Sequence, residues 1–467
     1  MAFPGRSLST HRYPTGCEEH FMGADRRIDE AIRAISAKEK SAAGEYHALP
    51  DRSRHGVLGV LDDRGLRLLT RFIKDSKKKS FREAGERLPG IAAALQQTPV
   101  YLIDEALIEE NMRVLRYVKD RTGCKILHAL KAYASFATFG VMAAYLDGVC
   151  ASGVNEARLG RKEFGKEVHT FGAAYGEKEI RQTVKYSDSV TFNSFYQLRK
   201  YAGIARKRGV QIGLRVNPGH AEVDTEMYNP CAPCSRLGIV HDEFAREFTR
   251  YLNVVDGLHF HAMCEQNSDV LERVLKSFER LYGSYINGLK WVNFGGGHHI
   301  TRDDYDLERL IRLVKNFKNK YGVEVYLEPG EASVYHAGVL ISTVLDIVKN
   351  EMEIAIMDTS AETHMPDVLL MPYRPLVLCS AEPGEKRHTY RLAGPSCLAG
   401  DIIGDYSFDE PLKRGDRLVF IDMALYSIVK STTFNGINLP DIAVVRKGGG
   451  VEVARRFGYR DYRMRQS

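Results

Sequence analysis

Hydrophobic and polar positions from about residue 98 onward alternate between two patterns. Short apolar runs rich in β-branched residues recur, and each is followed by a segment with apolar positions at helical spacing, such as residues 307–322. The runs are 125–131, 147–152, 167–172, 189–194, 211–217, 257–263, 291–297 and 324–330. Alternating strands and helices predict a parallel sheet, and eight such units in this length predict a closed (β/α)8 barrel of the TIM type.

The pattern changes after about residue 340. The later runs, such as 339–350 and 416–423, are β-rich, are separated by Gly and Pro turns, and have little helical periodicity. We therefore expect an α/β protein in which a C-terminal, mainly antiparallel β domain at 341–467 follows a barrel domain at 98–340. The leading run 98–104 could add a strand to the barrel.

Residues 1–97 form an N-terminal extension whose role is not readable from its sequence. Apolar periodicity predicts two helices in it, near 27–40 and 63–77. The extension holds 18 Lys and Arg against 13 Asp and Glu, so it carries most of the net charge of +6, including the run KDSKKKS at 74–80. We interpret it as a solvated, partly flexible segment, because a nucleic-acid-binding arm would be expected to interleave aromatic residues.

Composition places the chain among globular proteins, with 44% hydrophobic and 27% charged residues. No window reaches 18 uncharged apolar residues and no secretory signal opens the chain, so we expect no membrane association. The eight cysteines are scattered, and only Cys231 and Cys234 form a CxxC pair. This usage predicts reduced thiols, a cytoplasmic protein and no metal site.

Candidate functional residues lie at the carboxyl ends of the predicted strands, where barrel enzymes collect their active sites. They are Lys131 at the end of the first strand, Arg215 on the fifth, His259 and His261 on the sixth, Gly295, Gly296 and Gly297 at the end of the seventh, Glu328 at the end of the eighth, and Glu331 past the turn that follows. Lys131 ends an apolar strand and would point into a dry mouth, which suits a Schiff-base nucleophile, although strand-end lysines often form ordinary ion pairs. The glycines could present amides to a phosphate, although glycines also mark tight turns.

Glu328 has two compatible interpretations. If a pyridine ring lies between Lys131 and the end of the eighth strand, a carboxylate there would keep the ring nitrogen protonated. Alternatively, Glu328 is a structural acid paired with Arg215, and Arg215 would then order the site.

Several motifs together resemble the pyridoxal 5'-phosphate (PLP) decarboxylases with an alanine racemase/ornithine decarboxylase-like barrel. The resemblance rests on HALKA, GGG and EPGE in the barrel and on GPSCLAGD and DMALYSIVKSTTFNG in the second domain. Within that group, NPCAPCSRLG, GLHFHAMCEQ and HMPDVLLMPYRP are similar to carboxynorspermidine/carboxyspermidine decarboxylases, over about residues 98–460. This implies the cofactor PLP, a carboxylated polyamine as substrate, and norspermidine or spermidine as product.

The resemblance also implies roles for individual residues. It implies that Lys131 forms the imine with the cofactor, that Glu328 binds the pyridinium nitrogen and that His261 stacks on the ring. Phosphate contacts are implied for Gly295, Gly296, Gly297 and Tyr426. Cys397 is implied to donate the proton that replaces the carboxylate. Because Cys397 would come from a second subunit, a homodimer with shared active sites is implied. Glu331 stands where related decarboxylases usually have Arg, and a carboxylate favours the cationic amines of a polyamine. Asp367 and Asp401 are further candidates for those amines, although Asp367 could simply be a turn residue after Pro366.

Two departures and three alternatives remain. The 97-residue leader is longer than the family requires, and Cys234 stands where a glycine is expected. Diaminopimelate decarboxylase is the rival of the same fold. A metal-dependent barrel hydrolase could use His259, His261, His298 and His299 as ligands. A catalytically silent homologue should have lost Lys131 or Cys397, and both are present.

Overall fold

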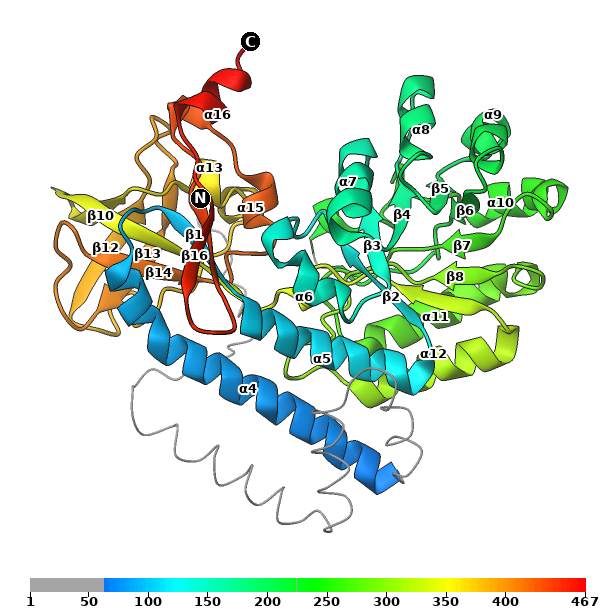
Figure 1. Cartoon of the computed structure of the whole chain (residues 1–467), viewed down its shortest axis with the longest axis horizontal. Helices are drawn as coiled ribbons and strands as arrows, with labels where there is room; N and C mark the ends of the chain where they lie inside the picture. Colours follow the sequence, from blue (N-terminus) through cyan, green and yellow to red (C-terminus); the bar gives the residue numbers. More distant parts are fainter. Residues whose placement is uncertain (1–62, 224) are drawn as a thin grey trace.

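The computed structural model describes residues 63–223 and 225–467, so the helix predicted near 27–40 lies outside the described residues. Figure 1 shows two parts side by side: a barrel surrounded by helices and a smaller β-rich domain. Within the described ranges, no helix combines the length and apolar character needed to cross a membrane.

The barrel consists of eight parallel strands, and every run predicted as a barrel strand forms one. They are β2 (Lys125–Ala129), β3 (Gly148–Ala151), β4 (Glu167–Phe171), β5 (Ser189–Phe192), β6 (Gln211–Arg215), β7 (Gly257–His259), β8 (Trp291–Asn293) and β9 (Glu324–Leu327). Strand β2 pairs with both β3 and β9, which closes the barrel. The predicted (β/α)8 fold is confirmed.

Helices cover the outside of the barrel and connect its strands. They are α5 (Glu105–Thr122), α6 (Phe139–Ala143), α7 (Val154–Leu159) with a π-helical turn η2 (Gly160–Phe164), α8 (Glu177–Thr183), α9 (Phe195–Arg206), α10 (His241–Glu247), α11 (Ser268–Tyr282) and α12 (Leu307–Tyr321). Helix α12 shows how local sequence sets these bounds. Asp306 accepts the Arg309 amide at its start, and Gly322, with φ +66°, donates to the Lys318 carbonyl at its end.

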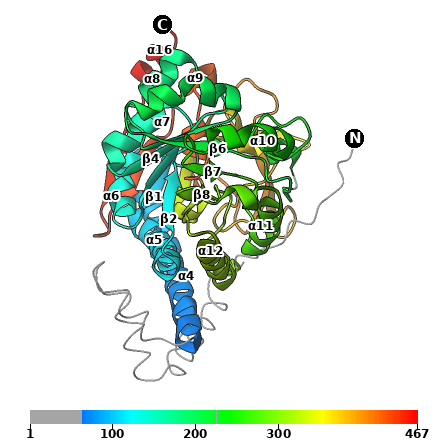
Figure 2. The ribbon, with the colours of Figure 1, turned by 90° about the vertical axis from the view of Figure 1, so that its right-hand side faces the viewer.

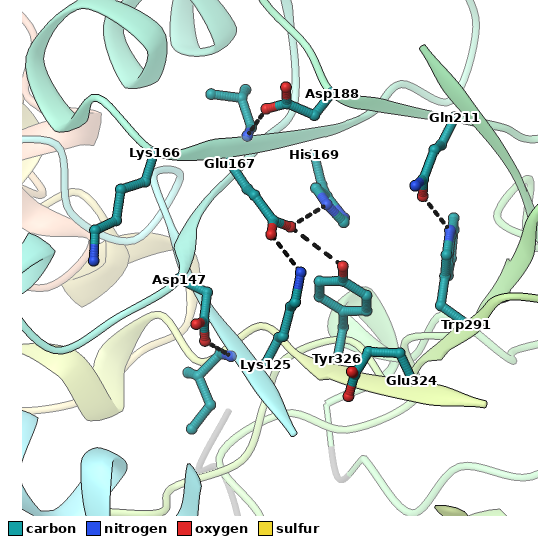
Figure 3. A network of polar contacts seen from close by, with 12 residues as sticks. Lys125, Asp147, Lys166, Glu167, His169, Asp188, Gln211, Trp291, Glu324 and Tyr326 are labelled. Atoms are coloured by element: carbon teal, nitrogen blue, oxygen red, sulfur yellow. Dashed lines mark hydrogen bonds and ion pairs between the residues drawn. The ribbon is translucent and has the colours of Figure 1, made fainter. Parts of the chain in front are cut away.

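Polar side chains close the amino-terminal end of the barrel (Figure 3). The carboxylate of Glu167 accepts from Lys125 at 2.5 Å and from the Tyr326 hydroxyl at 3.2 Å, and lies 3.3 Å from His169 Nε2. Burial acts to raise the pKa of Glu167, but these donors outweigh it and lower the pKa to about 2.

Trp291 fills the space above this layer. Its Nε1 donates to Gln211 Oε1 at 2.8 Å, as Figure 3 shows, and its ring occupies the place where a Cβ on Gly213 or Gly257 would lie. Side chains therefore fill the amino end of the barrel, and ligand chemistry is left to the carboxyl end.

The second domain is a mixed sheet in which β10 (Gly338–Asn350) is the longest strand. The other strands are β1 (Val100–Asp104), β11 (Met352–Met357), β12 (His388–Ala393), β13 (Ile402–Phe408), β14 (Arg417–Ile421), β15 (Asp441–Val445) and β16 (Val451–Arg455). Their order is β13-β12-β11-β10-β1-β15-β16, with β14 also paired to β10. Most pairs are antiparallel, as predicted, and β1–β15 and β11–β12 are parallel.

Short helical turns lie in the loops of both domains, and α16 follows the last strand. They are η1 (Phe136–Thr138), η3 (Glu226–Tyr228), η4 (Phe248–Tyr251), η5 (Gly283–Tyr285), η6 (Glu331–Ser333), α13 (Ala361–His364), α14 (Asp367–Leu370), α15 (Ser427–Lys430), η7 (Phe434–Gly436) and α16 (Tyr459–Met464).

Strand β1 corrects one prediction, since it does not join the barrel. It pairs with β10 on one side and β15 on the other, both in the second sheet. The closed barrel has no free edge to offer, whereas the sheet can bury both faces of β1. Tyr101 packs into the core on one face, and Val100 and Leu102 pack with Ala92 on the other. The domain limits near residues 97 and 340 otherwise stay a prediction.

The helix predicted near 63–77 is longer than expected. Helix α4 (Asp63–Ala94) lies beside α5 in both Figure 1 and Figure 2 and buries Leu69 and Ile73 in the barrel core. The interpretation of its lysine run as a solvated segment is wrong for Lys77, which is only 6% exposed.

Candidate active site

The predicted site residues lie at the carboxyl ends of five consecutive barrel strands. Because the strand order around this arc is β2, β9, β8, β7 and β6, the ends bring together the segments around Lys131, Glu328, Gly296, His261 and Arg215. Residues far apart in the sequence thus surround one mouth of the barrel.

Lys131 lies in a tight turn directly after β2. His128 Nε2 donates to the Tyr133 carbonyl at 2.7 Å, and the Ala132 amide donates to the Ala129 carbonyl at 3.0 Å. Burial lowers the pKa of His128 to about 4, so the imidazole is neutral and carries its proton on Nε2. The Lys131 side chain itself is exposed, which differs from the dry surroundings expected, because it follows the strand instead of ending it.

The second domain reaches this turn through Tyr426. The Tyr426 amide donates to the Ala132 carbonyl at 2.8 Å, next to Lys131. Tyr426 has φ 53°, a left-handed conformation that is uncommon for a residue with a side chain and often accompanies functional sites. Burial, followed by the charges of Glu331 and Glu265, raises its pKa. The structure thus brings Tyr426 to the site that the motif predicted.

Glu328 is a mostly buried carboxylate, with 12% of its side chain exposed, directly after β9. Asn293 Nδ2 donates to its Oε1 at 2.7 Å, and His259 Nε2 lies 3.5 Å from its Oε2. Burial alone would raise the pKa of Glu328, but His259 and the Asn293 hydrogen bond outweigh it and lower the pKa to about 2. Burial also lowers the pKa of His259, and the charge of Glu328 opposes that effect.

Arg215 does not form the ion pair with Glu328 that one interpretation required. Its guanidinium lies 4.5 Å from the ring centre of Phe171, and Nη2 donates to the His261 carbonyl at 3.4 Å. Burial lowers the pKa of Arg215 to about 10, and Glu328 opposes that effect at longer range. Arg215 therefore supplies a positive potential to the site without neutralising the acid by contact.

The three glycines let the chain after β8 pass between its neighbours. A Cβ at Gly295, Gly296 or Gly297 would lie 2.0–2.5 Å from a backbone carbonyl of Phe260, Glu328 or Met263. Gly295 and Gly297 also have positive φ, at 71° and 83°. These contacts explain the glycines without any ligand.

The glycine amides are only partly available to a ligand. The Gly295 amide donates to Asn293 Oδ1 at 2.8 Å, and the Gly296 amide donates to His261 Nδ1 at 2.8 Å. Because Nδ1 accepts, the neutral His261 carries its proton on Nε2; burial and the charge of Lys131 lower its pKa well below the usual value. The phosphate role of these glycines stays a prediction, and the Gly297 amide is the candidate donor.

Glu331 is not isolated at the mouth. Its Oε2 lies 2.5 Å from His299 Nε2, and its charge raises the pKa of Glu265 to about 7, with burial adding to the effect. Burial lowers the pKa of His299, but both acids outweigh it, so the pKa of His299 is raised. The charge of Glu331 thus raises the pKa of both Glu265 and His299. The sequence offered no signal for Glu265, and His299 was considered only as a metal ligand.

The other two predicted substrate acids already have partners. Asp367 forms an ion pair with Lys430. Asp401 is buried and accepts from Ser360 Oγ and the Ala361 amide, both at 2.8 Å, and from the Ser396 amide at 3.2 Å. These contacts assign Asp401 to the start of α13 and to the loop before β13, so the expectation that it reaches a substrate amine is not supported.

Cys397 lies in the same loop, which the second domain presents to solvent. Its side chain is exposed, and its amide donates to Asn435 Oδ1 at 2.7 Å. The loop is therefore held at both ends, by Asp401 and by Asn435, with the thiol free between them.

Two of the four histidines considered as metal ligands, His259 and His299, lie beside acids. Among residues 63–223 and 225–467, no group of three His, Cys, Asp or Glu side chains is arranged to hold a metal ion. Cys231 and Cys234 are both free thiols, and Cys234 has φ 62°, which explains why a glycine would be expected there.

Comparisons with known proteins agree with this site. A family model described as "Pyridoxal-dependent decarboxylase, C-terminal sheet domain" matches residues 60–424. The chain belongs to the pyridoxal-dependent decarboxylase family. It is 43% identical to the carboxynorspermidine/carboxyspermidine decarboxylase of Campylobacter jejuni, over 79% of this chain and 98% of that protein. It is 38% identical to the carboxyaminopropylagmatine decarboxylase of Synechocystis, over 79% of this chain and 95% of that protein.

Solved structures of the family share the fold. The crystal structure of Campylobacter jejuni carboxynorspermidine decarboxylase complexed with norspermidine has a TM-score of 0.74 and 42% identity, and covers 79% of this chain and 100% of that chain. Diaminopimelate decarboxylase from Helicobacter pylori has a TM-score of 0.68 at 20% identity, covering 79% of this chain and 97% of that chain. At that identity the likeness is one of fold alone.

The described residues of this family member fit PLP. An exposed amine at Lys131 can take the aldehyde, and Glu328 is buried yet ionised, as a partner of a protonated ring nitrogen must be. Asn293, which the sequence did not single out, joins that acid to the glycine turn because its amide contacts both. Titratable groups whose pKa values are shifted in this way cluster at functional sites.

Proposed function

We propose that this decarboxylase converts carboxynorspermidine and carboxyspermidine to norspermidine and spermidine. The observation that carries the proposal is the acid pair of Glu331 and Glu265, placed beside His299 at a mouth whose other acid, Glu328, is held by Asn293. A substrate with several ammonium groups matches two carboxylates better than a substrate that ends in a carboxylate does. The names of the relatives at 43% and 35% identity support the same substrate class.

The cofactor residues have distinct roles. When bound, PLP supplies an electron-withdrawing pyridinium ring that takes up the electron pair left as carbon dioxide departs. Lys131 would hold the cofactor covalently. Glu328, ionised at neutral pH, would keep the proton on the ring nitrogen, and His261 would pack against the ring. Gly297 and Tyr426 would bind the phosphate.

The acid pair places the amine chain of the substrate. Glu331 is fixed by the 2.5 Å contact with His299, and Glu265 lies close enough for its pKa to respond to Glu331. A bound ammonium would favour the ionised form of Glu265, because its positive charge offsets the repulsion from Glu331. Asp367 contributes less than expected, because Lys430 already neutralises it.

Cys397 of a second copy completes the site and returns a proton to the carbon that loses its carboxylate. Leu398 and Phe434, beside the exposed thiol, are themselves 41% and 43% exposed. Apolar side chains around a reactive group are typical of a surface that another subunit covers. The functional unit is accordingly a homodimer with two shared sites, and a cytoplasmic location agrees with the seven free thiols of the described residues.

The test compares kcat/KM for carboxynorspermidine, carboxyspermidine, carboxyaminopropylagmatine and meso-diaminopimelate. We expect the carboxylated triamines to be preferred, and Glu331→Gln to raise KM for them while the cofactor absorbance stays intact. Glu362→Gln, an acid of the second domain outside the barrel mouth, is the matched control. Preference for diaminopimelate, or a Glu331→Gln enzyme with unchanged KM, would contradict the proposal. Preference for carboxyaminopropylagmatine would contradict the triamine assignment and identify the guanidinium-bearing compound as the substrate.

A further inference from the structure

A buried lysine on the N-terminal helix lies directly behind the acid pair. Lys77 of α4 is 6% exposed, and its Nζ donates to the Thr301 carbonyl at 2.7 Å. The same ammonium group lies 5.0 Å from the ring centre of Tyr335. Lys77 thus contacts two segments that flank the acid pair, the loop after β8 and the turn after β9.

Each of these two contacts is connected by one further contact to Glu331's own segment or to its partner His299. Thr301 Oγ1 donates to the Ala332 carbonyl at 2.8 Å, and Ala332 follows Glu331 in η6. On the other side, the Tyr335 ring lies 5.7 Å from the ring of His299, which holds Glu331. The carbonyl that Lys77 binds therefore belongs to the loop that carries His299.

Helix α4 does not need the charge of Lys77 in order to dock. Leu69 and Ile73 are buried in the barrel core, Ala92 packs against β1, and Lys74 donates to the Tyr305 carbonyl at 2.7 Å. Burying an ammonium group is costly, and burial lowers the pKa of Lys77 to about 8. An apolar side chain of similar length would pack there at a lower cost in free energy. The charged group at this position therefore indicates that its function is to hold the loop it contacts.

We propose that Lys77 is a positioning residue for the substrate acids, acting through Thr301 and Tyr335 on Glu331 and His299. The inference rests on the proposed function, since it concerns the affinity of that site for the amine chain. It also gives the N-terminal helix a functional role, because α4 would support the recognition of substrate from outside the barrel.

The test compares Lys77→Met, Lys77→Arg and Lys78→Met. Lys78 is the exposed neighbour whose Nζ lies 3.7 Å from Asp303, so Lys78→Met removes the same charge by the same substitution. We expect Lys77→Met to raise KM for carboxynorspermidine and Kd for norspermidine about three- to tenfold, with kcat nearly unchanged. Lys77→Arg should recover part of that loss, and Lys78→Met should match the wild type.

Three results would overturn the inference. They are an unchanged KM and Kd in Lys77→Met, a loss confined to kcat, and an equal effect of Lys78→Met. Circular dichroism and a thermal melt establish that each variant is folded before these values are compared.

Amide hydrogen exchange keeps this inference separate from the proposed function. If wild-type protein neither binds norspermidine nor decarboxylates a triamine, the proposed function has failed. The positioning claim is then decided by exchange in residues 299–305 and 331–337. Faster exchange there in Lys77→Met than in Lys78→Met supports it, and equal exchange refutes it.

Discussion

Replacing Glu265 by Gln should remove the pH dependence of substrate affinity. The carboxyl of Glu265 has a pKa of about 7, since the Glu331 charge disfavours a second negative charge beside it. Below pH 7 Glu265 is protonated and attracts no ammonium group, and above pH 7 it is ionised and does. KM for carboxynorspermidine should therefore be high at pH 6 and fall toward pH 8.

The size of the effect follows from the titration of one group. Glu265→Gln removes this titrating group, which should leave KM nearly flat between pH 6 and pH 8. At pH 8 the variant should bind about fivefold more weakly than the wild type, a modest loss because Glu265 is exposed. For a pKa near 7, the ionised fraction grows about tenfold between pH 6 and pH 8; because the protonated form should bind about as weakly as the Gln variant, KM of the wild type should fall about three- to fourfold over that range.

The assay measures carbon dioxide release at pH 6, 7 and 8 at constant ionic strength. Titration of the substrate amines affects both enzymes equally, so the ratio of the two KM values isolates Glu265. Calorimetry of norspermidine binding in two buffers adds an independent reading, because binding near pH 7 should release a fraction of a proton from the wild type only. The same KM slope in both enzymes would refute the assignment of the titrating group.

Three other predictions concern the cofactor, the proton and the barrel. Asn293→Ala removes the hydrogen bond to Glu328 Oε1 and the acceptor of the Gly295 amide, and should weaken PLP binding about tenfold in an absorbance titration, whereas equal affinity would contradict the role of Asn293. Cys397→Ala should lower kcat and leave the absorbance spectrum of PLP intact. An unchanged kcat would exclude Cys397 as the proton donor. Glu167→Gln should lower the free energy of unfolding by about 1 kcal/mol at pH 7, without changing KM. Because the pKa of Glu167 is lowered, this difference in unfolding free energy should be present above about pH 4.5 and disappear as the pH falls toward 2. A difference that does not change with pH would contradict a stabilising ion pair at Glu167.

The barrel could be predicted from the sequence because each of its strands is a short, continuous apolar run. The strands are buried on both faces, and the residues that follow them must meet at one end. Lys131, Glu328 and His261 were found by that rule alone. Strand β1 could not be assigned correctly, because its partners β10 and β15 lie hundreds of residues later and its apolar run looks like any barrel strand.

The partners of the predicted acids could not be read from the sequence. Ser360 donates to Asp401, Lys430 pairs with Asp367, and His299 contacts Glu331. Glu265 has no motif, and only the fold brings it to Glu331. Sequence position can therefore place a carboxylate at the barrel mouth, whereas its protonation state depends on contacts across the site.

The two acids after β9 lie three residues apart and have different neighbours, which separates two functions in one short segment. Glu328 receives hydrogen-bond donors and keeps a pKa of about 2, so its charge is constant throughout the physiological range. Glu331 instead faces a second carboxylate, and its charge raises the pKa of that neighbour, Glu265, to about 7. Environments that push neighbouring carboxyl groups apart in this way commonly assign them different roles. The pH dependence between pH 6 and pH 8 should consequently appear in KM, through the acid pair, and not in the binding of PLP, because the partner of its ring nitrogen does not titrate there.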